Sequence, residues 1–116
     1  KNKDSKMQKI AQKRLIYAKK CIKKQDFNGF FEEVEKSLWN YFAFKFKVDS
    51  SNLSKETIYK YFKKNNLNEE IQNRFIKLLN ECEFARFSST KSKNMKMEVI
   101  LNQAKKIIIE VEKSLK

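Results

Sequence analysis

The sequence has 116 residues, enough for one domain, and combines 27 Lys and Arg with 14 Asp and Glu for a net charge of +13. It contains no His, two widely separated Cys and one Gly, which excludes Ser-His and Cys-His catalysis, zinc sites and glycine-rich phosphate or dinucleotide loops. We therefore expect a non-enzymatic chain with no cofactor, metal, catalytic residue or small-molecule substrate.

The positive charge is concentrated at the two ends of the chain. Residues 1 to 24 carry ten basic side chains and one acidic one, residues 25 to 90 carry ten of each, and residues 91 to 116 carry seven and three. No uninterrupted apolar run exceeds four residues, far short of the ~20 that span a bilayer. The chain begins at Lys1 rather than Met, so we expect it to be a segment of a longer protein. Cys21 and Cys82 are widely separated and form no CxxC pair, so we expect a reducing compartment rather than a disulfide framework.

Two long helices are expected first, over residues 5 to 24 and 27 to 46. In the first, apolar residues recur at steps of three or four, and most of the rest of the helix is Lys. Asp26 is a candidate N-cap for the second, which carries a broad aromatic face and the main part of the expected core. Gly29 lies in its first turn, where we expect it to permit close approach of a neighbouring helix. The two apolar stripes consist of Met7, Ala11, Leu15, Ala18 and Ile22, and of Phe27, Phe30, Phe31, Val34, Leu38, Tyr41 and Phe42.

Three further helices are expected over residues 55 to 64, 69 to 87 and 94 to 115. Ser54 and Asn68 are the candidate N-caps of the first two, and residues 88 to 94 form a loop. The last helix has the most regular apolar stripe, which is wider than a two-stranded coiled-coil seam and favours packing into a bundle. The fold class is thus all-α, a single five-helix bundle-like domain over residues 1 to 116.

The end of the fourth expected helix, residues 81 to 87 (ECEFARF), crowds two acids, an Arg and two Phe together. It is either a packed helix end, with Phe84 and Phe87 on the core and Cys82 buried, or a partner-binding corner that uses Arg86 and the acids Glu81 and Glu83. Glu83 and Arg86 are three residues apart, so they are able to pair on the helix surface.

Trp39 lies beside the apolar stripe of the second helix. It is either covered by the first or last helix or exposed as an interface anchor. The candidate partner contacts are therefore Trp39, Glu81, Glu83, Phe84 and Arg86.

The basic first helix has three candidate uses. Its charge exceeds what a solvated face needs, and nucleic-acid binding is less expected because Tyr17 is the only aromatic residue among its lysines. A position beside a membrane explains the lysine cluster better than either of these uses. Lys and Arg concentrate on the cytoplasmic side of spanning helices, where they attract anionic lipid. The candidate contacts with an anionic membrane surface are Lys6, Lys9, Lys13, Arg14 and Lys20.

Three blocks of the sequence together resemble the C-terminal region of the BatD family, the bacterial oxygen-tolerance (aerotolerance) proteins. They are residues Gln12–Leu15 with Ala18–Lys20, Ser37–Phe42 and Glu81–Phe87. The last block is the most specific of the three, and in order and spacing the resemblance covers nearly the whole chain.

The resemblance implies a helical cytosolic tail, tethered to the cytoplasmic face of the bacterial inner membrane by a spanning helix before Lys1. It implies a protein-interaction module that docks envelope-complex partners, namely von Willebrand A-type proteins and a MoxR-type ATPase. It carries no catalytic residues. A free nucleic-acid-binding domain and a purely structural oligomerisation bundle are the alternatives.

Overall fold

The computed structural model describes the backbone of residues 2–87 and 97–115, and the side chains of residues 9, 12–87 and 97–115. These residues form five α-helices and one short 3-10 helix: α1 (Asn2–Lys24), α2 (Phe27–Phe46), η1 (Ser50–Asn52), α3 (Lys55–Lys64), α4 (Glu69–Arg86) and α5 (Met97–Ser114). The expected all-α, bundle-like fold is confirmed. Helix α1 begins three residues earlier than predicted, and the predicted loop over 88 to 94 and first turn of the last helix lie outside the described residues.

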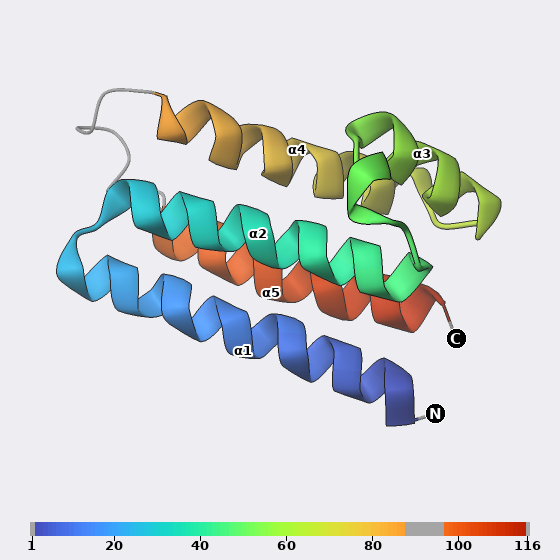
Figure 1. The fold of residues 1–116 in the computed structure, drawn as a ribbon, viewed down its shortest axis with the longest axis horizontal. Helices are drawn as coiled ribbons and strands as arrows, with labels where there is room; N and C mark the ends of the chain where they lie inside the picture. The colour runs from blue at the N-terminus through green and yellow to red at the C-terminus, as the bar shows by residue number, and fades with distance from the viewer. Residues whose placement is uncertain (1, 88–96, 116) are drawn as a thin grey trace.

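Helix α2 is the centre of the bundle. Figure 1 shows α1 on one side of α2, α4 on the other and α5 behind, and α5 also packs against α1 and α4. Helices α1 and α4 thus lie on opposite sides of the α2–α5 pair. The short α3 packs against α4 near the C-terminal end of α2.

The predicted N-caps are confirmed at all three positions. Asp26 accepts a hydrogen bond from the Gly29 amide at 3.1 Å, Ser54 accepts from the Thr57 amide at 3.1 Å, and Asn68 accepts from the Glu70 amide at 2.6 Å. Each side chain satisfies an amide that the first helical turn leaves without a carbonyl partner.

Gly29 lies against this cap, because the three atoms nearest to a Cβ at this position would all belong to Asp26. The expectation that Gly29 permits close approach of a neighbouring helix stays a prediction. A Cβ at this position would overlap Oδ2 of Asp26. The missing side chain therefore leaves room for the capping carboxylate of the same helix.

Three helix ends use a left-handed residue other than Gly. Gln25, Lys47 and Asn66 have φ values of 58°, 58° and 60°. The residue after each donates its amide to a carbonyl five residues earlier, at 2.9 to 3.0 Å, as in the usual C-terminal helix cap. Tight helix ends therefore form in a chain with one Gly, at the energetic cost of placing a Cβ in this region.

The core follows the predicted stripes closely. An aromatic cluster joins three helices, because the ring centroid of Phe62 in α3 lies 5.9 Å from that of Phe42 in α2 and 5.3 Å from that of Phe75 in α4. Helix α5 buries all of its predicted stripe except Leu115, which lies just after the helix and is half-buried. The buried members of that stripe are Met97, Ile100, Leu101, Ala104, Ile107, Ile108 and Val111. The largest fully buried side chains are Phe30, Phe31, Phe42, Phe62, Phe75, Leu15, Leu38, Ile58, Leu79, Met97, Ile107 and Ile108.

Candidate functional site

The solvent-facing side of α1 is a continuous cationic surface. It consists of exposed lysines with two exposed apolar residues, and no Asp or Glu occurs between residues 9 and 24. Helix α1 buries Leu15 and Ala18 on its other side, against the bundle. We call this surface the basic face; its members are Lys9, Lys13, Ile16, Tyr17, Lys19, Lys20, Lys23 and Lys24.

The two apolar residues of the basic face lie among its cations. The exposed fractions are 52% for Ile16 and 53% for Tyr17, and the ammonium of Lys20 lies 5.4 Å from the centroid of the Tyr17 ring. A surface with this composition offers both charge and apolar contact to a ligand.

The predicted membrane contacts divide into three groups. Lys9, Lys13 and Lys20 are exposed on the basic face. Arg14 points instead toward α2, where its Nη1 lies 3.2 Å from Oε1 of Glu33, so its charge is paired within the bundle. The side chain of Lys6 lies outside the described residues.

A second candidate surface lies at the C-terminal end of α4, where four charges connect three helices. Nε of Arg86 lies 2.9 Å from Oε1 of Glu35 in α2, and Nζ of Lys55 at the start of α3 lies 2.9 Å from Oε1 of Glu83. Glu83 and Arg86 were expected to pair with each other. Instead, Arg86 pairs with α2 and Glu83 pairs with α3. Burial raises the pKa of the Glu35 carboxyl, although the Arg86 guanidinium opposes this shift.

The aromatic residues at this end of α4 are solvent-exposed. The exposed fractions are 75% for Phe84 and 79% for Phe87, and the guanidinium of Arg86 lies 5.3 Å from the Phe87 ring centroid. The expectation that a packed helix end would bury both rings is therefore wrong, whereas Cys82 is fully buried as that account predicted. Trp39 is half-buried and packs against the core, so it lies between its two expected positions.

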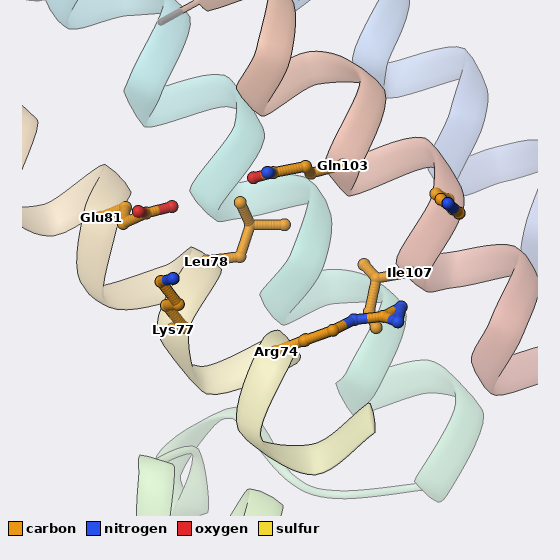
Figure 2. Close-up of a pocket in the computed structure, with 7 residues that line it drawn as sticks. Arg74, Lys77, Leu78, Glu81, Gln103 and Ile107 are labelled. Carbon is orange, nitrogen blue, oxygen red and sulfur yellow. The ribbon is translucent and has the colours of Figure 1, made fainter. Parts of the chain in front are cut away.

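Glu81 lies away from these ion pairs, in a pocket of about 350 Å³ between α4 and α5. Figure 2 shows Glu81 and Gln103 pointing toward each other across this pocket, with Leu78 between the two helices. The five predicted partner contacts are thus distributed over several surfaces.

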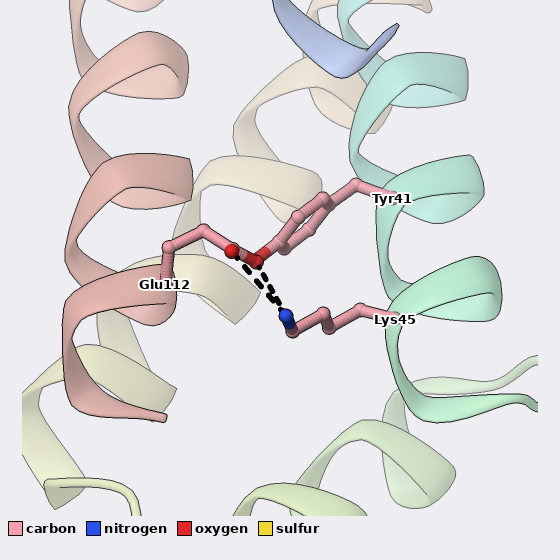
Figure 3. A network of polar contacts seen from close by, with 3 residues as sticks. All are labelled: Tyr41, Lys45 and Glu112. Atoms are coloured by element: carbon pink, nitrogen blue, oxygen red, sulfur yellow. Dashed lines mark hydrogen bonds and ion pairs between the residues drawn. The ribbon is translucent and has the colours of Figure 1, made fainter. Parts of the chain in front are cut away.

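Sequence reasoning missed a buried polar network between α2 and α5. The side chains of Lys45 and Glu112 are only 9% and 5% exposed, and their charged atoms lie 3.2 Å apart. Tyr41 donates a hydrogen bond to the same carboxylate (Figure 3). A signal was present, since Glu112 follows Ile108 by one helical turn on the apolar side of α5, and Lys45 follows Tyr41 in the same way on α2.

Two other kinds of site do not occur in the part of the chain that the structure describes. None of the helices in residues 2–87 and 97–115 combines the length and the hydrophobicity of a bilayer-spanning segment. Within the same ranges, no three Cys, Asp or Glu side chains come together in a group that could hold a metal ion.

Comparison of the chain with known proteins matched no protein-family model, no curated protein and no solved structure. The resemblance to the BatD family therefore stays a prediction from the sequence blocks that carry it.

Proposed function

We propose that this chain is a non-enzymatic interaction domain that lies against an anionic membrane surface through the basic face of α1. The observation that carries the proposal is the composition of that face, in which exposed lysines surround Ile16 and Tyr17 and no acid is present. Anionic lipid attracts the lysines, and the interface between headgroups and acyl chains accepts the apolar side chains.

The energetics of this surface favour lipid over simple solvation. Each Lys near an anionic bilayer contributes about 1 kcal/mol of attraction, and the basic face presents six of them on one side of a single helix. Burial of Ile16 and Tyr17 in the headgroup region adds a hydrophobic contribution. A nucleic acid would attract the same lysines but offers no comparable place for the Ile16 side chain.

The protein partner in this proposal binds at a different part of the domain. Helix α4 lies across the bundle from α1, and Phe84 and Phe87 are exposed near its C-terminal end (Figure 1). Exposed phenyl rings beside an Arg are frequent anchors in protein interfaces. The BatD resemblance implies that the partner is a von Willebrand A-type protein or a MoxR-type ATPase, with the domain on the cytoplasmic face of the inner membrane.

The membrane part of the proposal is tested by vesicle co-sedimentation. The probes are phosphatidylcholine vesicles with and without about one-third phosphatidylserine, at two salt concentrations. We expect binding only to the anionic vesicles, with affinity that falls as salt rises. The triple substitution Lys13→Gln, Lys20→Gln and Lys24→Gln should weaken binding on the order of 100-fold, because it removes about 3 kcal/mol of attraction.

The matched control replaces three exposed lysines of α3: Lys60→Gln, Lys63→Gln and Lys64→Gln. It lowers the net charge by the same amount but leaves the basic face intact. Equal weakening by the two triple variants would show that net charge rather than the basic face drives binding. Tighter binding to duplex or single-stranded nucleic acid than to anionic vesicles would replace the proposal by the nucleic-acid alternative.

The partner part is tested by pull-down from membranes with a Phe84→Ser/Phe87→Ser variant as the control bait. Recovery of an ATPase or a von Willebrand A-type protein by the wild type alone supports docking at the end of α4. Equal recovery by both baits contradicts it. Sedimentation velocity of the free domain separates a monomer from the oligomerisation bundle.

A further inference from the structure

The pocket between α4 and α5 has an apolar floor and a charged rim. Leu78 and Ile107 are almost fully buried at its base, while Lys77, Lys106 and Gln103 are exposed around it. The lining residues recur three and four positions apart on both helices, so each helix contributes one continuous stripe to the pocket. This arrangement places long polar side chains around a small apolar surface.

Side chains of both helices lie at the two ends of the pocket, which is partly open to solvent. At one end Arg74 crosses from α4 to α5, where its Nη2 lies 2.6 Å from Oε1 of Glu110. At the other end Glu81 and Gln103 point toward each other (Figure 2). The pocket volume of about 350 Å³ lies near the lower limit of small-molecule pockets and suits a compact ligand rather than a long peptide.

The charges that remain in the pocket favour an anion. Arg74 is paired with Glu110, whereas neither Lys77 nor Lys106 has an ion-pair partner among the described residues. Glu81 is the one acid in the lining. Within the described residues, the lining thus contains two lysines without an ion-pair partner and one acid beside an apolar floor.

We propose that this pocket binds a compact amphipathic anion, an apolar body that carries one carboxylate, sulfonate or phosphate. The apolar body lies against Leu78 and Ile107, and the anionic group reaches the ammonium group of Lys77 or of Lys106 at the rim of the pocket. The site is independent of the proposed membrane function, because it lies between α4 and α5 rather than on the basic face of α1.

The experiment compares two probes with the same apolar body and opposite charge, octanoate and octylammonium. Each is titrated into the ¹⁵N-labelled domain while backbone amide shifts are followed by NMR, which assigns binding to a place on the chain. We expect octanoate to shift amides around Leu78 and Ile107 in a saturable way. Octylammonium should leave these amides unshifted at the same concentration.

Three variants test whether octanoate affinity depends on the charges of the pocket in the predicted direction. Lys77→Gln with Lys106→Gln should weaken octanoate binding at the pocket about tenfold, because each exposed charge contributes about threefold. Glu81→Gln removes the carboxylate that repels the anion and should strengthen octanoate binding about threefold. Lys13→Gln with Lys20→Gln lowers the net charge equally on the far side of the bundle and should leave it unchanged.

Several results would overturn the proposal. Octanoate shifts that spread over all lysine-bearing surfaces, or that lie only on α1, would show non-specific attraction to a cationic protein. Equal binding of octylammonium, or weaker octanoate binding in Glu81→Gln, would contradict the assigned charges. Thermal unfolding of each variant verifies that the fold is intact, since the exposed lysines contribute little to stability.

Discussion

Replacing Lys45 by Met should destabilise the domain far more than replacing any exposed lysine. The side chain lies in the buried network with Glu112 and Tyr41, and its removal leaves the Glu112 carboxylate buried without its cation. Breaking a buried ion pair from one side typically costs about 3 to 5 kcal/mol. Tyr41 still donates its hydrogen bond to the carboxylate, so we expect the lower limit of that range.

That loss is a large part of the total stability. A chain of 116 residues has an unfolding free energy of about 6 to 17 kcal/mol. In urea denaturation followed by circular dichroism, a slope of about 2 kcal/mol per M converts the expected loss into a midpoint shift of about 1.5 M. Lys60→Met on the exposed side of α3 is the control and should change stability by less than about 0.5 kcal/mol.

The triple variant Tyr41→Phe, Lys45→Met and Glu112→Leu completes the test. It replaces the whole network by apolar side chains and should recover most of the stability that Lys45→Met loses, because no charge is left buried without a partner. A cost below about 1 kcal/mol for Lys45→Met would show that the carboxylate of Glu112 does not need this cation. A triple variant less stable than Lys45→Met alone would contradict the expected recovery.

Four further predictions concern helix ends, one surface ion pair and one thiol. Lys47→Gly should stabilise the domain by about 0.5 to 1 kcal/mol in urea denaturation, because it relieves a left-handed Cβ; a loss of stability would contradict this. Gly29→Ala should give less than the gain of about 1 kcal/mol that helix propensity predicts, because its Cβ displaces the capping carboxylate; a full gain would show that the cap adapts without cost. The hydrogen bond from Lys55 lowers the pKa of Glu83, so its stabilising effect is present above the unfolded pKa of 4.5 and is lost as the pH falls through the lower folded value. The difference in Tm between wild type and Lys55→Gln should accordingly shrink below about pH 4.5, and a constant difference would exclude this linkage. Burial raises the pKa of the Cys82 thiol to about 12, so its alkylation by iodoacetamide near pH 8 should follow global unfolding in urea; fast labelling of the native domain would contradict its burial.

Most of the helical structure was predictable because its signals are local. Capping residues such as Asp26, Ser54 and Asn68 act within one helical turn, and apolar residues that recur at helical spacing identify the buried side of each helix. The predicted bounds of the second and third helices are those observed, and the buried stripe of α5 follows the predicted residues. The left-handed ends at Gln25 and Lys47 were missed because the usual Gly signal is absent there.

The helical residues and the apolar side of each helix follow from the sequence alone, because both depend on neighbours within a few positions. The partners and the exposure of individual side chains on those helices depend instead on how the helices pack. Arg14, Arg86 and Glu83 pair across to other helices, Glu112 lies beside Lys45 in the core, and Phe87 is exposed. These outcomes depend on which helices become neighbours and in what register, and residues 19 to 67 positions apart along the chain contain no local signal of that pairing.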